Sequence, residues 1–311
     1  KEMIRSMVID LLQGQKQEMA SSQPIKQAPR GQVEPGVFDT VDEAIQAAKA
    51  AQARFEDCTL ATREKVIADI RAAMRPRVQE LAQKTVDETG MGRVADKVLK
   101  LNLTLDKTPG VEDLVTECET GDNGMTLYEL SAYGVIGAVT PSTNPAETLI
   151  CNTIGMLAAG NAVFFSVHPG AKHLSRLLVS ELNQIIAKSI GIENLIVTLR
   201  EPSIESAQEM MLHPDVSLLV VTGGPGVVKQ ALQSGKKVIG AGAGNPPAFV
   251  DETADIKKAA QDIVLGASLD NNILCIAEKS VVAMRQIEPQ LVQEMVKAGC
   301  ILLENQQDIQ R

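Results

Sequence analysis

The sequence is poor in the residues that build several kinds of binding site. It has no tryptophan and only two tyrosines, and its 39 acidic residues outnumber 30 basic ones, for a formal net charge of -9. Nucleic-acid-binding proteins usually carry a basic patch and often aromatic stacking platforms, so this composition argues against a nucleic-acid partner. Its apolar runs are strand-sized, below the roughly 20 residues that a helix needs to cross a bilayer. We therefore expect no membrane span.

Potential metal ligands are also few and scattered. The three histidines form no HExxH pattern, and the five cysteines lack CxxC spacing. These cysteines are Cys58, Cys118, Cys151, Cys275 and Cys300. An odd number of cysteines without a disulfide framework is typical of a reducing compartment. The sequence therefore predicts no metal site.

A regular alternation of strands and helices dominates the middle of the chain. Apolar strands are predicted at 135–140, 162–167, 195–199, 216–222 and 237–240, and helices at 146–159, 172–189, 204–212 and 226–233. Further helices are predicted at 40–55, 62–88 and 94–105, and a strand at 125–130. Such alternation indicates an α/β fold, a doubly wound parallel sheet with helices on both faces.

Three strand-to-helix loops hold glycine, proline and hydroxyl residues. The candidate ligand-binding residues in them are Thr140, Pro141, Ser142, Thr143, His168, Pro169, Gly170, Thr222, Gly223, Gly224 and Gly226. Parallel sheets bind ligands at the carboxyl ends of their strands, where helix N-termini offer N–H groups to phosphates. The first strand is not followed by a GxGxxG motif, so a tight-turn role for these loops stays open as well.

The rest of the chain is organised around a glycine-rich stretch and a later cysteine. Gly242, Ala243 and Gly244 are further candidate cofactor-binding residues, and no carboxylate lies between Lys237 and Asp251. Glycines let backbone approach a ligand or another backbone closely. Strands at 247–250 and 279–284, with helices at 253–266 and 288–297, predict the start of a second α/β domain. That domain would bring the Cys275 thiol to the nucleotide.

The N-terminal segment differs in composition from the remainder of the chain. Residues 1–12 place apolar side chains on one helical face, while the next stretch is rich in glutamine, serine, proline and glycine. The predicted units are an amphipathic helix within 1–20, a linker at 21–36, a nucleotide-binding domain at 37–240 and part of a catalytic domain at 241–311. The short helix would either dock on a partner or pack on its own domain. Both alternatives stay open.

Several ordered motifs resemble one protein family. They are Tyr133–Glu147, Leu157–Asn161, Val221–Gly224, Gly242–Pro247 and Asn271–Cys275. The chain, from about residue 36 onward, resembles the CoA-acylating aldehyde dehydrogenases of ethanolamine- and propanediol-utilising bacterial microcompartments. Its first 20 residues resemble their encapsulation peptides, which implies a shell partner and a cytoplasmic location inside a microcompartment. The family's enzymes continue past the nucleophile and form homo-oligomers, so the resemblance implies that the second domain is incomplete here.

The resemblance assigns roles to individual residues. Cys275 would attack a short aldehyde, acetaldehyde or propionaldehyde, to give a thiohemiacetal. Hydride transfer to NAD would leave a thioester, which coenzyme A would accept. The Cys275 backbone N–H and Asn144 would form the oxyanion hole, and the strand-end loops and glycine-rich stretch would line NAD. For Asn144, capping of the helix that begins beside it is the alternative.

Two departures from the hydrolytic aldehyde dehydrogenases matter. Those enzymes carry a glutamate in the glycine-rich stretch that activates water, whereas residues 242–245 here hold no acid or base. Water is a poor acceptor without a general base, so the thiol of coenzyme A is favoured. His168 stands where a lysine usually reaches the adenosine ribose, which favours NAD over NADP, although this histidine could simply cap its own turn.

Two alternative functions remain at this point. One is a hydrolytic aldehyde dehydrogenase, and the other is a truncated, non-catalytic microcompartment cargo protein. Among the other reactive side chains, Cys151 lies within a predicted helix, and we expect it to be buried in the protein core. Glu147 and Glu278 are candidate acids that we expect to be surface or structural carboxylates.

Overall fold

A computed structural model describes residues 34–303, 305 and 307 of the chain. The predicted amphipathic helix and nearly all of the predicted linker lie outside the described residues. Within those residues, no helix is both long and apolar enough to cross a membrane. The same part of the chain contains no group of three or more His, Cys, Asp or Glu side chains arranged to hold a metal ion.

A six-stranded parallel sheet forms the centre of the described structure. Its strands are β1 (Val37–Phe38), β4 (Val135–Val139), β5 (Ala162–Ser166), β6 (Ile196–Leu199), β7 (Val216–Thr222) and β8 (Lys237–Ala241). Their order is β1-β6-β5-β4-β7-β8. Because β4 and β7 are neighbours, the chain runs outward in one direction from β4 and then returns to continue in the other. The α/β doubly wound fold is therefore confirmed.

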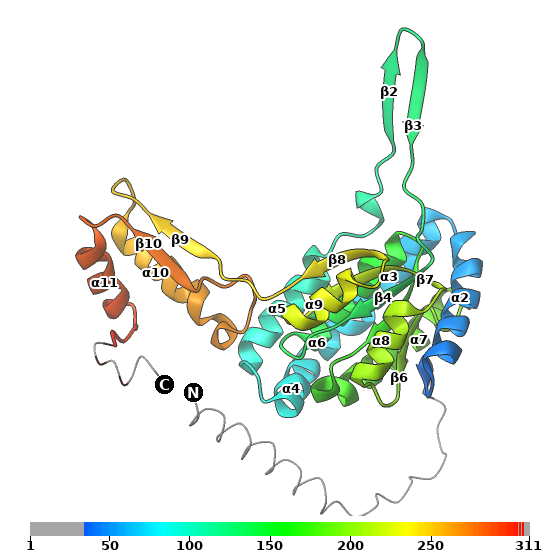
Figure 1. Ribbon diagram of the computed structural model, residues 1–311, viewed down its shortest axis with the longest axis horizontal. Coiled ribbons are helices and arrows are strands. Elements are labelled where there is room, and N and C mark those ends of the chain that lie inside the picture. The colour runs from blue at the N-terminus through cyan, green and yellow to red at the C-terminus, as the bar shows by residue number, and fades with distance from the viewer. Residues whose placement is uncertain (1–33, 304, 306, 308–311) are drawn as a thin grey trace, which may run out of the picture. The chain divides into compact units, whose positions relative to one another are not determined.

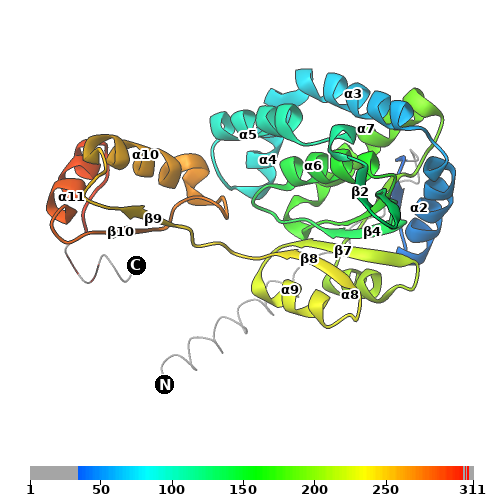
Figure 2. The same cartoon turned by 90° about the horizontal axis from the view of Figure 1, so that it is seen from above.

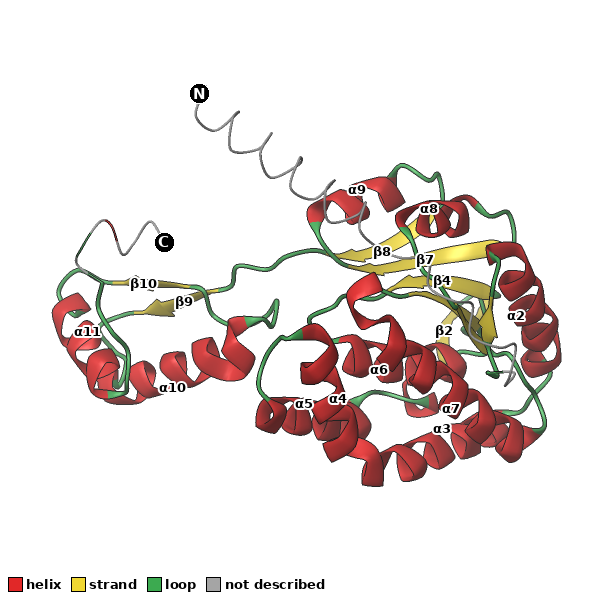
Figure 3. Cartoon of the chain, turned by 90° about the horizontal axis from the view of Figure 1, so that it is seen from below, coloured by secondary structure: helices red, strands yellow, loops and turns green. Residues whose placement is uncertain are grey.

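Helices cover both faces of this sheet (Figures 2 and 3). On one face, α6 (Pro145–Ala158) and α7 (Lys172–Ile190) pack on the strands, beneath α3 (Leu60–Met74), α4 (Val78–Thr89) and α5 (Val94–Lys107). On the other lie α2 (Val41–Glu56), α8 (Ile204–Leu212) and α9 (Pro225–Leu232). Covered on both sides, β4, β5 and β6 are buried along their whole length, which explains their unbroken apolar runs.

Three local features differ from the sequence-based expectation. The single helix expected at 62–88 is broken by the 3₁₀ turn η1 (Arg75–Arg77), because Pro76 cannot donate its N–H or continue an α-helix. The strand β3 (Gly124–Tyr128) pairs with β2 (Glu117–Gly121) in an exposed hairpin (Figure 1), although only one strand was predicted there. The two-residue strand β1 was not predicted at all.

A smaller unit lies after the glycine-rich stretch. Strands β9 (Pro247–Val250) and β10 (Ser280–Ala283) pair in parallel, and α10 (Ile256–Ser268) packs against α11 (Glu288–Lys297). The buried side chains of this unit are Val250, Ala260, Ile263 and Leu291. Three further 3₁₀ turns complete the described elements: η2 (Val111–Asp113), η3 (Pro169–Ala171) and η4 (Leu269–Asn272). The last of these turns precedes Cys275.

Candidate active site

The carboxyl ends of β4 and β7 offer an open, partly polar surface. Thr140, at the end of β4, is buried, and its hydroxyl has no hydrogen-bond partner among the described residues. Its backbone N–H donates to the Ser166 carbonyl at the end of β5, 3.1 Å away. After β7, a Cβ on Gly224, just before α9, or on Gly226, in its first turn, would meet no heavy atom within 4 Å. The loops therefore provide an unsatisfied hydroxyl and free space for a ligand.

The loop after β5 is already capped from within the chain. Nδ1 of His168 accepts the Gly170 N–H at 3.0 Å, so the turn-capping interpretation of this histidine is confirmed. At the start of α7, the Glu88 carboxylate from α4 accepts the His173 and Leu174 N–H groups at 2.8 and 2.7 Å. The expectation that this helix end offers free N–H groups is therefore wrong at these two positions, because a carboxylate occupies them.

Asn144 lies at the N-cap position, directly before the first residue of α6, but its side chain does not cap that helix. Its side chain makes no capping hydrogen bond, so the capping alternative is wrong. Instead its Oδ1 accepts a hydrogen bond from Nζ of Lys100, and its Nδ2 donates to Oγ1 of Thr143 at 3.3 Å. The amide is thus held by neighbouring side chains and not by the helix backbone. The oxyanion role of Asn144 stays a prediction.

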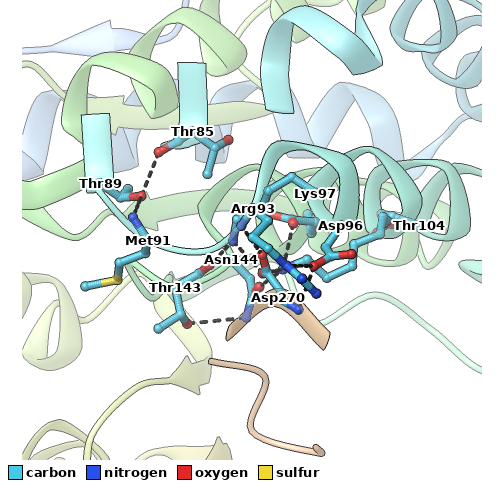
Figure 4. A network of polar contacts seen from close by, with 12 residues as sticks. Thr85, Thr89, Met91, Arg93, Asp96, Lys97, Thr104, Thr143, Asn144 and Asp270 are labelled. Carbon is cyan, nitrogen blue, oxygen red and sulfur yellow. Dashed lines mark hydrogen bonds and ion pairs between the residues drawn. The ribbon is translucent and has the colours of Figure 1, made fainter. Parts of the chain in front are cut away.

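Four charged side chains gather in the interior next to Asn144. Lys97 and Asp270 are fully buried, and Lys100 and Glu147 are nearly so. Lys97 Nζ lies 3.0 Å from Oδ2 of Asp270 and donates to the Thr143 carbonyl at 2.5 Å. Lys100 pairs with the same Asp270 oxygen and lies 3.1 Å from Oε1 of Glu147. Figure 4 shows Lys97, Asn144 and Asp270 of this cluster. Glu147 is therefore a buried structural carboxylate, one of the two kinds expected.

The protonation of this cluster is set by burial and pairing. Burial lowers the pKa of Lys97 below its ordinary value, against the pull of Glu147 and Asp270. Burial also acts to lower the pKa of Lys100, but Glu147 and Asp270 outweigh it and raise that pKa. For Asp270, burial opposes ionisation, yet the hydrogen bonds from Lys100, the Arg93 N–H and Lys97 hold its pKa below the usual range. We therefore take Asp270 as a carboxylate and Lys100 as an ammonium.

Asp270 begins a left-handed turn that leads to the cysteine. Asp270, Asn271 and Asn272 have φ angles of 51°, 56° and 60° in succession, a conformation that aspartate and asparagine tolerate better than most residues. Oδ1 of Asp270 accepts the Arg93 N–H at 2.8 Å, next to Gly92. A Cβ on Gly92 would lie 2.1 Å from that oxygen, so only glycine fits there. The turn is thereby fixed to the start of α5.

The segment that carries Cys275 lies against the glycine-rich stretch and is bound by the Lys279 side chain. Cys275 itself is exposed, and its carbonyl oxygen would lie 2.0 Å from a Cβ on Gly244, so the glycine-rich stretch passes directly beside it. Lys279 binds the Leu274 carbonyl at 3.0 Å and Oδ1 of Asn272 at 2.5 Å. The half-buried Glu278 carboxylate lies against Gly266 in α10.

Some side chains at the site escaped the sequence-based prediction. Lys97, Lys100, Lys279 and Asp270 were not singled out. The usable signal was a pair of lysines, three residues apart, on a helix whose inner face otherwise carries Leu101 and Leu105. The expectation that Cys151 lies in the core is wrong, because it is on the exposed side of α6.

The model of the "Aldehyde dehydrogenase family" matches residues 11–302 of this chain. The chain belongs to the aldehyde dehydrogenase family. It is 53% identical over 268 residues to the propanal dehydrogenase (CoA-propanoylating) of Salmonella typhimurium, which covers 86% of this chain. This membership confirms the family resemblance that the motifs indicated.

Two solved structures extend the comparison. The propionaldehyde dehydrogenase of the Clostridium phytofermentans fucose-utilisation microcompartment is 50% identical, with a TM-score of 0.85 over 88% of this chain. The Rhodopseudomonas palustris propionaldehyde dehydrogenase, solved with bound CoA and an acylated cysteine, is 49% identical, with a TM-score of 0.85 over 89%. This chain spans 58% of the Salmonella relative and 64% of each of the two solved chains.

Proposed function

We propose that the protein is a CoA-acylating aldehyde dehydrogenase that converts a short aldehyde to its acyl-CoA, with NAD as the hydride acceptor. The observation that carries this proposal is the position of Cys275. Cys275 is exposed, and its backbone lies directly beside the glycine-rich stretch. That stretch contains no carboxylate. The relatives named CoA-propanoylating and propionaldehyde dehydrogenase support propionaldehyde as a substrate, with acetaldehyde as the shorter alternative.

The chain's own residues would act through Cys275 and Asn144. The Cys275 thiolate attacks the aldehyde carbon, and a carbon–sulfur bond forms while negative charge develops on the oxygen. The Asn144 amide and the Cys275 N–H donate to that oxygen. After oxidation the acyl group is a thioester, whose carbonyl carbon the coenzyme A thiolate attacks, releasing the Cys275 thiolate. Without a general base beside the thioester, water remains a poor competitor.

The strand-end loops fit a dinucleotide in three respects. Thr140 presents a buried hydroxyl without a partner among the described residues, and Gly224 and Gly226 leave space for a close approach. Bound NAD would supply the hydride acceptor, and these residues would bind and orient it. The carboxylate of Glu88, a residue of α4, reaches the start of α7 and places negative charge beside the loop after β5. This loop is near the strand end where doubly wound folds bind the adenosine ribose. A 2′-phosphate would be repelled there, which favours NAD over NADP.

The test monitors aldehyde-dependent NADH formation in the presence of CoA. Cys275→Ala is expected to abolish it, because the thiol that the proposal assigns to the acyl intermediate is removed. Cys151→Ala is the matched control, since Cys151 is also exposed but lies on the outer side of α6. Activity retained by Cys275→Ala, with acyl-CoA still formed, would remove the proposal.

We also propose that the protein associates with further copies of itself. The hairpin of β2 and β3 exposes Met125, Leu127 and Tyr128 to solvent, and a contiguous exposed apolar patch is typical of a protein–protein contact. Light scattering on the wild type and on Leu127→Glu would test this. The wild type is expected to have a mass above that of one chain and the variant a lower one. A wild type with the mass of one chain would contradict it.

For residues 1–20 we propose docking to a microcompartment shell protein. Support comes from their amphipathic pattern and from the relative in a fucose-utilisation microcompartment. A fluorescent protein fused to these residues should collect in microcompartments, and a fusion with Ile4, Met7 and Leu11 changed to serine should not. Diffuse fluorescence from the unaltered fusion would count against docking, and with it against a location inside the compartment.

A further inference from the structure

Lys100 stands between the predicted oxyanion amide and the segment that carries the nucleophile. Its side chain is 9% exposed. Its Nζ donates to Oδ1 of Asn144 and Oδ2 of Asp270, and lies 3.1 Å from Oε1 of Glu147. The contacts with Asn144 and Asp270 are hydrogen bonds, whereas the contact with Glu147 is an ion pair by distance and not a hydrogen bond. One side chain therefore joins α5, the start of α6 and the turn before Cys275.

This contact determines how the Asn144 amide is turned. A lysine ammonium can only donate, so the atom facing it must be the amide oxygen, and Nδ2 points away from it. Nδ2 makes one bond of 3.3 Å to Thr143 (Figure 4), and its second hydrogen has no partner among the described residues. An oxyanion hole requires its donor to be aimed before the charge appears. Lys100 holds the oxygen end of the amide and thereby fixes the direction in which Nδ2 points.

Lys97 adds a second tether at the same place. It donates to the Thr143 carbonyl, one residue before Asn144, and pairs with Asp270. Buried ion pairs are weak evidence for stability, because well-packed apolar side chains of the same size often stabilise a protein equally well or better. The presence of two buried lysines here is better explained by what they hold, the backbone and side chain at Thr143 and Asn144.

We propose that Lys100 is a positioning residue, which turns the Asn144 amide toward the reacting carbonyl oxygen and links it through Asp270 to the segment that carries Cys275. This inference rests on the function proposed above, since an oxyanion forms only if Cys275 attacks a carbonyl group. It predicts that loss of Lys100 impairs acyl transfer to Cys275 selectively. Reactions of the same thiol that form no oxyanion should be spared.

The test compares two electrophiles on the whole 311-residue chain. With p-nitrophenyl acetate, the Cys275 sulfur forms a bond to the carbonyl carbon, the ester carbon–oxygen bond breaks, p-nitrophenolate leaves with the electron pair, and the thiol proton passes to solvent. With iodoacetamide, the sulfur displaces iodide and no oxyanion forms. Both rates are measured by mass spectrometry of the peptide that contains Cys275, with Cys275→Ala as the blank. Their ratio cancels changes in thiol exposure or pKa.

The variants separate positioning from folding. Lys100→Met is expected to lower the acetylation rate by about 10-fold, less than the loss of a whole oxyanion donor, about 100-fold in Asn144→Ala. Because Lys100→Met leaves Asp270 and Glu147 short of a partner, Lys100→Met/Glu147→Gln removes one charge of each sign and serves as the folded equivalent, checked by its unfolding temperature. Lys100→Arg keeps the donor and should recover part of the acetylation rate. Lys100→Met/Asn144→Ala should be no slower than Asn144→Ala alone.

Each outcome decides the question. A fall in acetylation with alkylation unchanged supports the positioning role. An equal fall in both rates, or no fall in either, in Lys100→Met/Glu147→Gln overturns it while the proposed function stands. If wild-type Cys275 takes iodoacetamide but never the acetyl group, the proposed function fails and this inference fails with it.

Discussion

Asp270 shows how one buried carboxylate can organise a site. It accepts hydrogen bonds from Lys100, Lys97 and the Arg93 N–H, while its own N–H donates to Asp96 at 2.9 Å. These contacts join α5 to the turn before the nucleophile. A buried charge is costly without its partners. Removing Asp270 would therefore leave Lys97 and Lys100 without this counter-charge, and removing the lysines would leave Asp270 without one.

We predict that Asp270→Asn destabilises the protein by about 3 kcal/mol at neutral pH, the cost of leaving buried charges unpaired. The pKa of Asp270 is below its ordinary value in the folded state. The carboxylate's contribution is therefore present above its unfolded pKa of about 3.9 and is lost as pH falls through the folded pKa. The gap in unfolding temperature between wild type and variant should be constant above that range and shrink below it.

The control for this prediction is Asp262→Asn. Asp262 is an exposed partner of Lys258 on α10, and surface pairs contribute little. Its replacement should leave the unfolding temperature nearly unchanged at any pH. A gap for Asp270→Asn that is absent at neutral pH, or that widens in acid, would contradict the assigned charge.

Glu88 leads to a prediction about cofactor choice. Glu88→Gln should raise NADP affinity relative to NAD by about 10-fold, because one repulsive charge is removed from a half-exposed site. Affinities measured by titration calorimetry on the isolated chain need no catalysis. Glu64→Gln, at an exposed position on α3, should leave the ratio unaltered. A ratio equally unaltered in Glu88→Gln would show that Glu88 does not face the ribose.

At the residue scale, the sequence identifies candidate reactive residues more readily than it predicts the contacts that those residues make. The family motifs single out Cys275 and Asn144 as candidates. Lys97 and Lys100 could not be predicted in their roles, because their partners lie 46 and 170 positions away and lysine usually marks a solvated face. The same holds for Cys151, whose exposed position depends on which side of α6 meets its neighbours.

At the scale of elements, periodicity predicts most strands and helices of the main sheet. Expected and observed bounds agree within one or two residues from residue 135 to residue 241, because apolar strands and amphipathic helices alternate there without interruption. The failures have local causes. Pro76 breaks a helix that the apolar periodicity predicts as continuous. The sequence of β2 is polar and lacks a strand pattern, and this segment forms a strand by pairing with β3.

The glycine-rich stretch leads to a prediction at this scale. Gly244→Ala should lower the rate of Cys275 acetylation about 10-fold or more, because the added Cβ would meet the Cys275 carbonyl at 2.0 Å and misplace the thiol, a displacement to which catalysis is sensitive. Gly155→Ala, within α6 and with no atom near an added Cβ, is the control. An undiminished rate in Gly244→Ala would show that the two segments move independently.

At the scale of the whole molecule, two sheets contribute to one candidate site. The main sheet provides the strand-end loops and Asn144, and the smaller unit provides Cys275 and Asp270. The buried charge cluster joins the two parts, because Lys97 and Lys100 are on α5, which packs with the main sheet's helices, and Asp270 is in η4, which leads to Cys275. Such a meeting of segments is a tertiary property, which explains why the motifs predict the participants but not the way they are joined.

The account depends most on what happens to an acyl group on Cys275. The direct measurement is to acetylate Cys275 with p-nitrophenyl acetate, remove the reagent, and monitor the acetyl-Cys275 peptide by mass spectrometry with and without CoA. Because residues 242–245 offer no base to activate water, we predict a thioester that persists in buffer and disappears on addition of CoA as acetyl-CoA forms. Loss of the acetyl group at the same rate without CoA, with acetate as the product, would contradict the account.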